Sequence, residues 1–110
     1  EGSAKITIDE FAKVELRVAT VKAAEPHPKA DRLLVLTIDL GTEERQLVAG
    51  IRAHYTPEEL IGKQIVVVAN LQPAVLRGVE SQGMLLAASD GEKVIVLGPE
   101  KPIAAGSKVR

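Results

Sequence analysis

Cysteine and tryptophan are absent from this 110-residue chain, and aromatic rings are scarce: Phe11 and Tyr55 are the one phenylalanine and the one tyrosine. Without cysteine, the chain forms neither a disulfide framework nor a thiolate metal site. That absence fits a reducing compartment, and we expect a cytoplasmic location. With so few aromatic side chains, we do not expect a platform that stacks single-stranded bases.

Long apolar runs and catalytic motifs are also lacking. No run approaches the ~20 residues that a membrane span needs, and we expect no signal peptide and no membrane partner. The sequence contains no HExxH, GxSxG, GxGxxG or Walker pattern. His27 is flanked by two prolines and His54 precedes Tyr55, and neither histidine stands in a pattern that would activate a nucleophile. We therefore expect no catalytic residue, no metal site and no cofactor.

Charge of one sign is not in excess, because 14 Lys+Arg face 15 Asp+Glu and the formal net charge is −1. Autonomous nucleic-acid binders usually carry a clear basic excess, since phosphate contacts dominate their affinity. A nucleic-acid role would therefore need a local basic patch, or help from a parent chain or a second copy. The sequence begins with Glu1 rather than Met, and we interpret residues 1–110 as one domain cut from a longer protein.

The pattern that is present is mostly that of strands, with apolar and polar residues alternating between turn signals. Capping residues predict a helical turn at residues 7–10 and a second short helix at residues 56–62. The alternation slips near residues 19–21, which predicts a bulge. The predicted strands cover residues 14–24, 32–41, 44–50, 63–70, 83–89 and 93–98, with a last short strand near residues 107–110. Three strands, a helix and further strands indicate an all-β, five-stranded OB-fold Greek-key barrel with its short helix between strands three and four.

A candidate binding loop interrupts residues 66–88, which are strand-like at both ends and polar in the middle. Taken singly, Asn70, Ser81 and Gln82 are more often partners of a strand end or a turn, and Met84 more often belongs to a core. Their clustering on a barrel loop favours ligand binding, because OB barrels bind through loops and one face. The basic residues that would form one lane beside this loop, if they meet, are Lys29, Arg32, Arg45, Arg52 and Arg77.

Five segments carry a family resemblance: FAKVELRVATV, KADRLLVLTIDLG, RQLVAGI, YTPEELIGK and VANLQPAVLRGVESQGMLLAAS. In this order they closely resemble the tRNA-binding domain shared by the C-terminal end of many bacterial methionyl-tRNA synthetases and by free-standing tRNA-binding proteins. The resemblance implies an OB-fold homodimer that grips tRNA by shape, with the N-terminal turn and the C-terminal extension helping to form the dimer.

The resemblance also implies a set of RNA-binding residues. They are Lys29, Arg32, Arg45, Arg52, Asn70, Arg77, Ser81, Gln82 and Met84. Relatives often carry basic residues where this chain has Ala74 and Val75, so we expect a weak contact that a symmetric dimer makes twice.

The sequence thus predicts a non-catalytic domain that binds tRNA and forms a homodimer. We expect it to be the C-terminal domain of a methionyl-tRNA synthetase, covalently linked to a catalytic methionine–tRNA ligase. One alternative is a free-standing tRNA-binding protein. Another is an export-related, chaperone-like peptide-binding module, which the near-neutral charge and the apolar loop residues Pro73, Val75, Leu76 and Val79 favour. A last alternative is dimerisation alone.

Overall fold

The computed structural model describes residues 3–110, so the Glu1-Gly2 start discussed above lies outside the described residues. Strands make up most of the regular structure, and the two helices, α1 (Ile8–Phe11) and α2 (Pro57–Leu60), have four residues each. The strands are β1 (Leu16–Pro26), β2 (Leu34–Asp39), β3 (Glu44–Ala49), β4 (Gln64–Val68), β5 (Ala74–Leu76), β6 (Val79–Ser81), β7 (Met84–Leu85), β8 (Ala87–Ser89), β9 (Val94–Val96) and β10 (Lys108–Val109).

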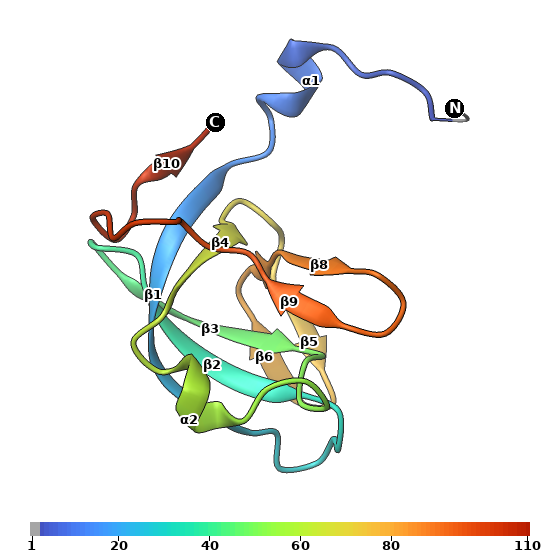
Figure 1. Ribbon diagram of the computed structural model, residues 1–110, viewed down its shortest axis with the longest axis vertical. Helices are drawn as coiled ribbons and strands as arrows, with labels where there is room; N and C mark the ends of the chain where they lie inside the picture. The colour runs from blue at the N-terminus through green and yellow to red at the C-terminus, as the bar shows by residue number, and fades with distance from the viewer. Residues whose placement is uncertain (1–2) are drawn as a thin grey trace.

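Strand β1 organises the barrel because it pairs along both edges. Its first half pairs with β4, where Leu16 lies opposite Val68, and its second half pairs with β2. The register shifts between Val21 and Ala23, just beyond the predicted bulge, and this lets the strand pass from one partner to the other. With β3 beside β2 and β7 beside β4, the sheet curls into a nearly closed barrel (Figure 1). The predicted all-β, OB-like architecture is confirmed.

The core fills the inside of this barrel. Leu34, Leu36 and Ile38 share one face of β2, as the alternation predicts, and each is at most 1% exposed. Leu60 of α2 is fully buried, and the helix, which comes between β3 and β4 in the chain, packs beside β1 at one end of the barrel (Figure 1). Burying each side chain of this size stabilises the fold by about 1.5–3 kcal/mol. The barrel therefore supplies the rigid frame on which the loops are held.

Both predicted helices are present and begin as their capping residues indicate. At α1 the backbone N–H of Glu10 donates to the Oγ1 of Thr7 at 3.1 Å, and the backbone N–H of Thr7 donates to the Glu10 carboxylate at 2.8 Å. At α2 the backbone N–H of Thr56 donates to the Glu59 carboxylate at 2.7 Å. No helix within residues 3–110 is long and apolar enough to cross a membrane.

The polar loop within residues 66–88 is more regular than predicted, because it folds into the β5–β6 hairpin. Arg77 and Gly78 form the two-residue turn, with φ angles of 54° and 91°. Positive φ at both positions is typical of a type I′ turn, for which Asn-Gly is the usual sequence. An arginine in the first position gives a weak turn signal, which explains why the hairpin was not predicted. The predicted strand 83–89 is likewise divided, into β7 and β8.

The two ends of the described chain lie on the same side of the molecule. Strand β10 pairs with the start of β1, and α1 stands clear of the barrel beyond it (Figure 1). The segment before β10 packs so tightly that a Cβ at Gly106 would collide with the carbonyl oxygen of Leu40. The C-terminal segment is therefore fixed on the barrel, whereas α1 buries none of its residues.

Candidate nucleic-acid interface

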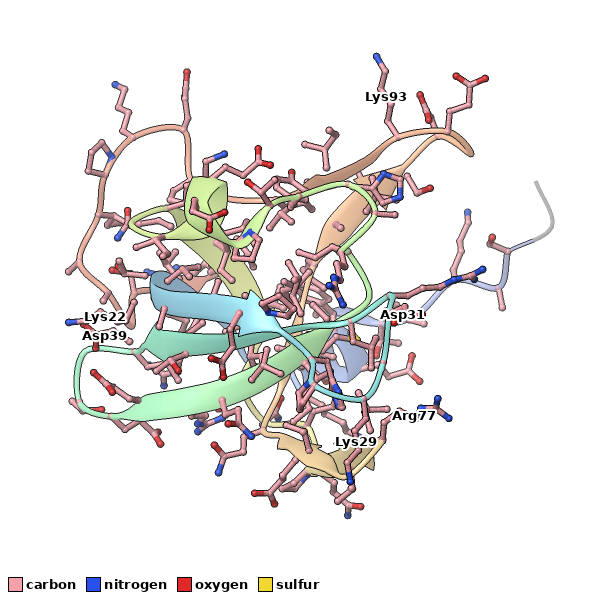
Figure 2. All side chains as sticks on the ribbon, turned by 90° about the horizontal axis from the view of Figure 1, so that it is seen from below. Lys22, Lys29, Asp31, Asp39, Arg77 and Lys93 are labelled. Carbon is pink, nitrogen blue, oxygen red and sulfur yellow. The ribbon has the colours of Figure 1, made fainter. Side chains whose placement is uncertain are left out.

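Four of the five predicted basic residues lie on the loop of residues 27–33, on the segment bonded to it, or at the turn of the β5–β6 hairpin. Lys29 and Arg77 line the same open depression, which has a volume of about 440 Å³ (Figure 2). Arg32 and Arg52 lie on adjacent segments, since the backbone N–H of Arg52 donates to the carbonyl of Arg32 at 3.3 Å. Lys29 and Arg32 belong to the same loop, residues 27–33, which joins the two pairs. We call Lys29, Arg32, Arg52 and Arg77 the cationic cluster.

The charges of the cationic cluster are available to a ligand. All four side chains are exposed. Within residues 3–110 none of them enters an ion pair, and the two ion pairs that do form use other arginines. Asp31, on the same loop, partly offsets the positive charge (Figure 2). Because a guanidinium offers forked donors to a phosphate, Arg77 at the hairpin tip is the best-placed phosphate ligand of the set.

Arg45, the fifth predicted basic residue, is held by the fold. Its Nε and Nη2 donate to the two carboxylate oxygens of Glu43 at 3.2 and 3.0 Å, and its Nη1 donates to the carbonyl oxygen of Ala69 at 2.5 Å. The hydrogen bond from Arg45, and then its positive charge, hold the pKa of the Glu43 carboxyl below its ordinary value. Arg45 is therefore held by protein partners, and its place in a lane with the other four basic residues stays a prediction.

A second arginine shares the surroundings of Arg45 and is neutralised in the same way. Arg17 of β1 pairs with Glu15, and its Nη1 donates to the carbonyl oxygen of Gly106 at 2.9 Å. The two Arg–Glu pairs line a polar pocket of about 270 Å³. Since each guanidinium has its own carboxylate, this pocket presents little net charge to a polyanion.

Asn70 fastens the N-terminal segment to the barrel. Its Oδ1 accepts from the backbone N–H of Glu15 at 2.8 Å, and its Nδ2 donates to the carbonyl of Lys13 at 2.6 Å. The alternative in which Asn70 serves a strand end is thus present in the structure. Met84 lies nearby on β7, opposite Val68 in the pairing with β4, and is 46% exposed.

Ser81 and Gln82 fasten the base of the β5–β6 hairpin to β3. Ser81 is 5% exposed, and its Oγ accepts from the backbone N–H of Val48 at 3.0 Å and donates to the carbonyl of Gly83 at 2.9 Å. Gln82 forms two hydrogen bonds with the backbone of Gln46. Its Oε1 accepts from the backbone N–H of Gln46 at 3.0 Å, and its backbone N–H donates to the carbonyl of Gln46 at 2.8 Å. Both residues serve the backbone, as the turn interpretation allows, and the hydroxyl of Ser81 is sealed from solvent.

Sequence reasoning missed His27, which is 3% exposed and connects the cationic cluster internally. Its ring joins the backbone of Lys29 to that of Leu76, the residue before Arg77. The two prolines that flank it gave a loop signal and nothing that indicated this contact. No group of three metal-ligating side chains occurs in the part of the chain that the structure describes.

Comparison with known proteins gives the family. A family model described as "Putative tRNA binding domain" matches residues 16–108. The methionine–tRNA ligase of Methanococcus aeolicus is 61% identical over 104 residues, which is 94% of this chain and 15% of that protein. The chain spans between 14% and 16% of the length of the curated relatives it matches.

Two solved structures share the whole fold. The methionyl-tRNA synthetase-related protein of Pyrococcus horikoshii has a TM-score of 0.92 and 38% identity, covering 98% of this chain and 100% of that one. The chaperone CsaA of Bacillus anthracis has a TM-score of 0.89 and 33% identity, covering 97% of this chain and 100% of that one. The family model and these full-length matches agree, and the chain belongs to the tRNA-binding domain family.

Proposed function

We propose that the cationic cluster binds the phosphate backbone of tRNA and thereby holds tRNA for a methionine–tRNA ligase module in the same chain. The observation that carries this proposal is that Lys29 and Arg77 of this family domain line one depression, are exposed and form no ion pair with any other residue of the range 3–110. The 61% sequence identity to the methionine–tRNA ligase of Methanococcus aeolicus supports the link to a synthetase. We place this function in the cytoplasm, in keeping with a chain that lacks cysteine.

Recognition by shape fits these side chains better than recognition of bases. Folded RNA exposes phosphates and 2′-hydroxyls that basic and polar side chains contact without reading sequence. The ring of Tyr55 is used by the protein, since its hydroxyl accepts from the backbone N–H of Val96 at 2.9 Å and the Lys63 ammonium lies 5.8 Å from its centroid. No stacking platform is therefore assigned to the site.

The domain also pairs with a second copy in this proposal, through the segment that contains α1. Ile6 is 64% exposed, Ile8 77% and Phe11 39%, although all three are large apolar residues. A helix of four residues is not stable in water without packing, and none of the residues of α1 is buried on its own barrel. Pairing would cover these residues and bring two cationic clusters to one tRNA, which raises the effective concentration of the second contact.

Competition binding tests the tRNA proposal. Filter binding at low salt compares tRNA with a DNA duplex of similar length, and the salt dependence of the tRNA affinity is then measured. We expect tRNA to be preferred and the affinity to fall steeply with salt, since phosphate contacts release counterions. Equal retention of tRNA and duplex would reject the proposal.

Sedimentation tests the pairing. We expect the wild-type chain to sediment as a dimer at micromolar concentration and the double variant Ile8→Ser, Phe11→Ser to sediment as a monomer. These changes leave the barrel core intact, because neither residue is buried. A monomeric wild-type chain would refute the pairing and would also exclude dimerisation as the domain's own function.

A second candidate function is peptide binding, which the fold shared with the chaperone CsaA favours. Val75 is 69% exposed and Leu76 39% exposed on β5, so the hairpin offers an apolar surface beside the cationic cluster. Peptide-array binding that survives high salt, with no retention of tRNA, would select this function over the first.

A further inference from the structure

His27 is a buried histidine with both ring nitrogens satisfied. It is 3% exposed, Nδ1 lies 2.9 Å from the backbone nitrogen of Lys29, and Nε2 lies 2.9 Å from the carbonyl oxygen of Leu76. A buried polar group without a partner costs about 1–3 kcal/mol, so two such bonds on one imidazole fix the ring firmly in place.

The two partners determine which nitrogen carries the proton. A backbone N–H only donates, so Nδ1 accepts from Lys29 and carries no hydrogen. A backbone carbonyl only accepts, so Nε2 donates to Leu76. With these partners the ring carries its proton on Nε2, and its bond to Leu76 joins two residues that are 49 positions apart in the sequence.

These two segments carry the two cations that line the common depression. Lys29 itself provides one of the backbone bonds, and Leu76 is followed directly by Arg77, the first turn residue of the hairpin. The base of the hairpin is fastened to β3 through Ser81 and Gln82. Within residues 3–110, the bond from His27 is the side-chain hydrogen bond that fastens the tip.

We propose that His27 is a positioning residue for tRNA binding, and that its Nε2–H bond to Leu76 holds Arg77 at a fixed place beside Lys29. The imidazole does not contact RNA, because His27 is only 3% exposed. Without the bond, the hairpin tip moves relative to loop 27–33, and tRNA binding must order the tip at a cost to affinity. This inference rests on the proposed tRNA function and adds to it the hydrogen bond that positions Arg77 in the site.

Two substitutions separate the two bonds of the ring. His27→Asn keeps an acceptor near the position of Nδ1 and removes the donor to Leu76, whereas His27→Gln keeps a donor near the position of Nε2. His54→Asn is the matched control, because it makes the same exchange at an exposed histidine that takes no part in the bonds to Lys29 and Leu76, although it follows Arg52 by two residues. We expect His27→Asn to weaken tRNA binding about two- to tenfold, a range set by the ordering cost of mobile groups. His27→Gln and His54→Asn should bind tRNA as the wild type does.

A double-mutant cycle distinguishes positioning from a general loss of structure. The variant Lys29→Ala, Arg77→Ala lacks the two cations whose relative place the His27 bond is proposed to fix, so adding His27→Asn should not weaken binding further. A full additional loss in that background would overturn the proposal. The proposal would also be overturned if Arg77→Ala weakens tRNA binding but His27→Asn binds tRNA with the affinity of the wild type. If the wild-type chain itself fails to bind tRNA, the proposed function is wrong and this inference is wrong with it. If the wild-type chain binds tRNA and only the His27 variants behave otherwise than expected, this inference alone is wrong.

Nitrogen NMR of the wild-type imidazole provides a test that needs no variant to fold. Long-range proton–nitrogen correlation spectra should show the His27 proton on Nε2, protected from exchange, and the heteronuclear NOE of Arg77 should be that of an ordered residue. In His27→Asn that NOE should fall, while the amides of β2 keep theirs. An Nδ1–H tautomer in the wild type, or an unchanged Arg77 NOE in the variant, would overturn the proposal.

Discussion

The two ends of the β5–β6 hairpin use their polar side chains in opposite ways. At the base, Ser81 and Gln82 bond to the backbone of β3, and Ser81 is sealed from solvent. At the tip, Arg77 is exposed and forms no ion pair within residues 3–110. The base therefore builds the hairpin, and the tip is left free to bind.

This difference shows why a count of charged residues is a poor guide to binding. The chain as a whole has a net charge of −1. Glu43 and Glu15 nevertheless neutralise two arginines on one part of the barrel, whereas the cationic cluster forms no ion pair with the described residues 3–110. Local availability decides whether a cation can replace the counterions of a phosphate.

Removing the hydroxyl at the base should have the largest effect on stability. Ser81→Ala leaves the buried N–H of Val48 without its partner, which costs about 1–3 kcal/mol in the free energy of unfolding. Urea denaturation measures this loss, and Ser3→Ala, at an exposed position, is the matched control. The folded fraction of Ser81→Ala should retain its tRNA affinity. Equal stability of the two variants would contradict the role assigned to the base.

Changing the tip should reverse this pattern. Arg77→Asn removes a charge and replaces a residue with φ of 54° by one suited to the turn. The left-handed conformation costs a typical residue about 1–2 kcal/mol, so stability should rise by a fraction of that amount. Binding of tRNA should weaken roughly tenfold, as for a lost charge-assisted hydrogen bond, and the salt dependence should flatten.

Arg77→Lys serves as the control for the tip, because it keeps the charge and loses the fork of the guanidinium. We expect an affinity between those of the wild type and Arg77→Asn. A salt slope that is the same in all three chains would remove Arg77 from the binding site.

The barrel was predictable because its signals are local. Leu34, Leu36 and Ile38 alternate along one strand, and Thr7 and Thr56 stand where helices begin, so neighbouring residues suffice to predict both features. The partner of Ser81 is Val48, 33 residues away along the chain, and no local pattern connects them.

The candidate site was predictable only in part, for the same reason. The five arginine and lysine positions were visible in the sequence, but their grouping depends on the unpredicted hairpin turn at Arg77 and on the long-range contact of His27. One signal could have been used: Glu43 stands just before β3 and two residues before Arg45, a spacing that puts side chains on the same side of extended backbone. That spacing would have indicated that Arg45 is neutralised.

Two further arginines extend the comparison with smaller effects. Arg45→Ala removes the donor to the carbonyl oxygen of Ala69 and should lower stability by about 1 kcal/mol while tRNA affinity stays unchanged. Arg52→Ala, at an exposed side chain, should change stability by no more than about 0.5 kcal/mol and weaken tRNA binding. Parallel urea and filter-binding measurements check both, and a larger loss of tRNA affinity in Arg45→Ala than in Arg52→Ala would reverse the assignment.

The smallest expected effect is a shift in the titration of Glu43. The hydrogen bond and charge of Arg45 hold the pKa of this carboxyl below the ordinary value of 4.5, so the folded state binds its proton less readily than the unfolded state. The resulting stabilisation is complete above pH 4.5 and is lost as the pH falls through the lower, folded value. Carboxyl NMR titration should therefore show the pKa of Glu43 rising in Arg45→Ala. Asp90 provides the internal control, because backbone N–H groups of Lys93 and Glu92 lower its pKa; a matching rise at Asp90 would show that the whole fold has changed and not the single pair.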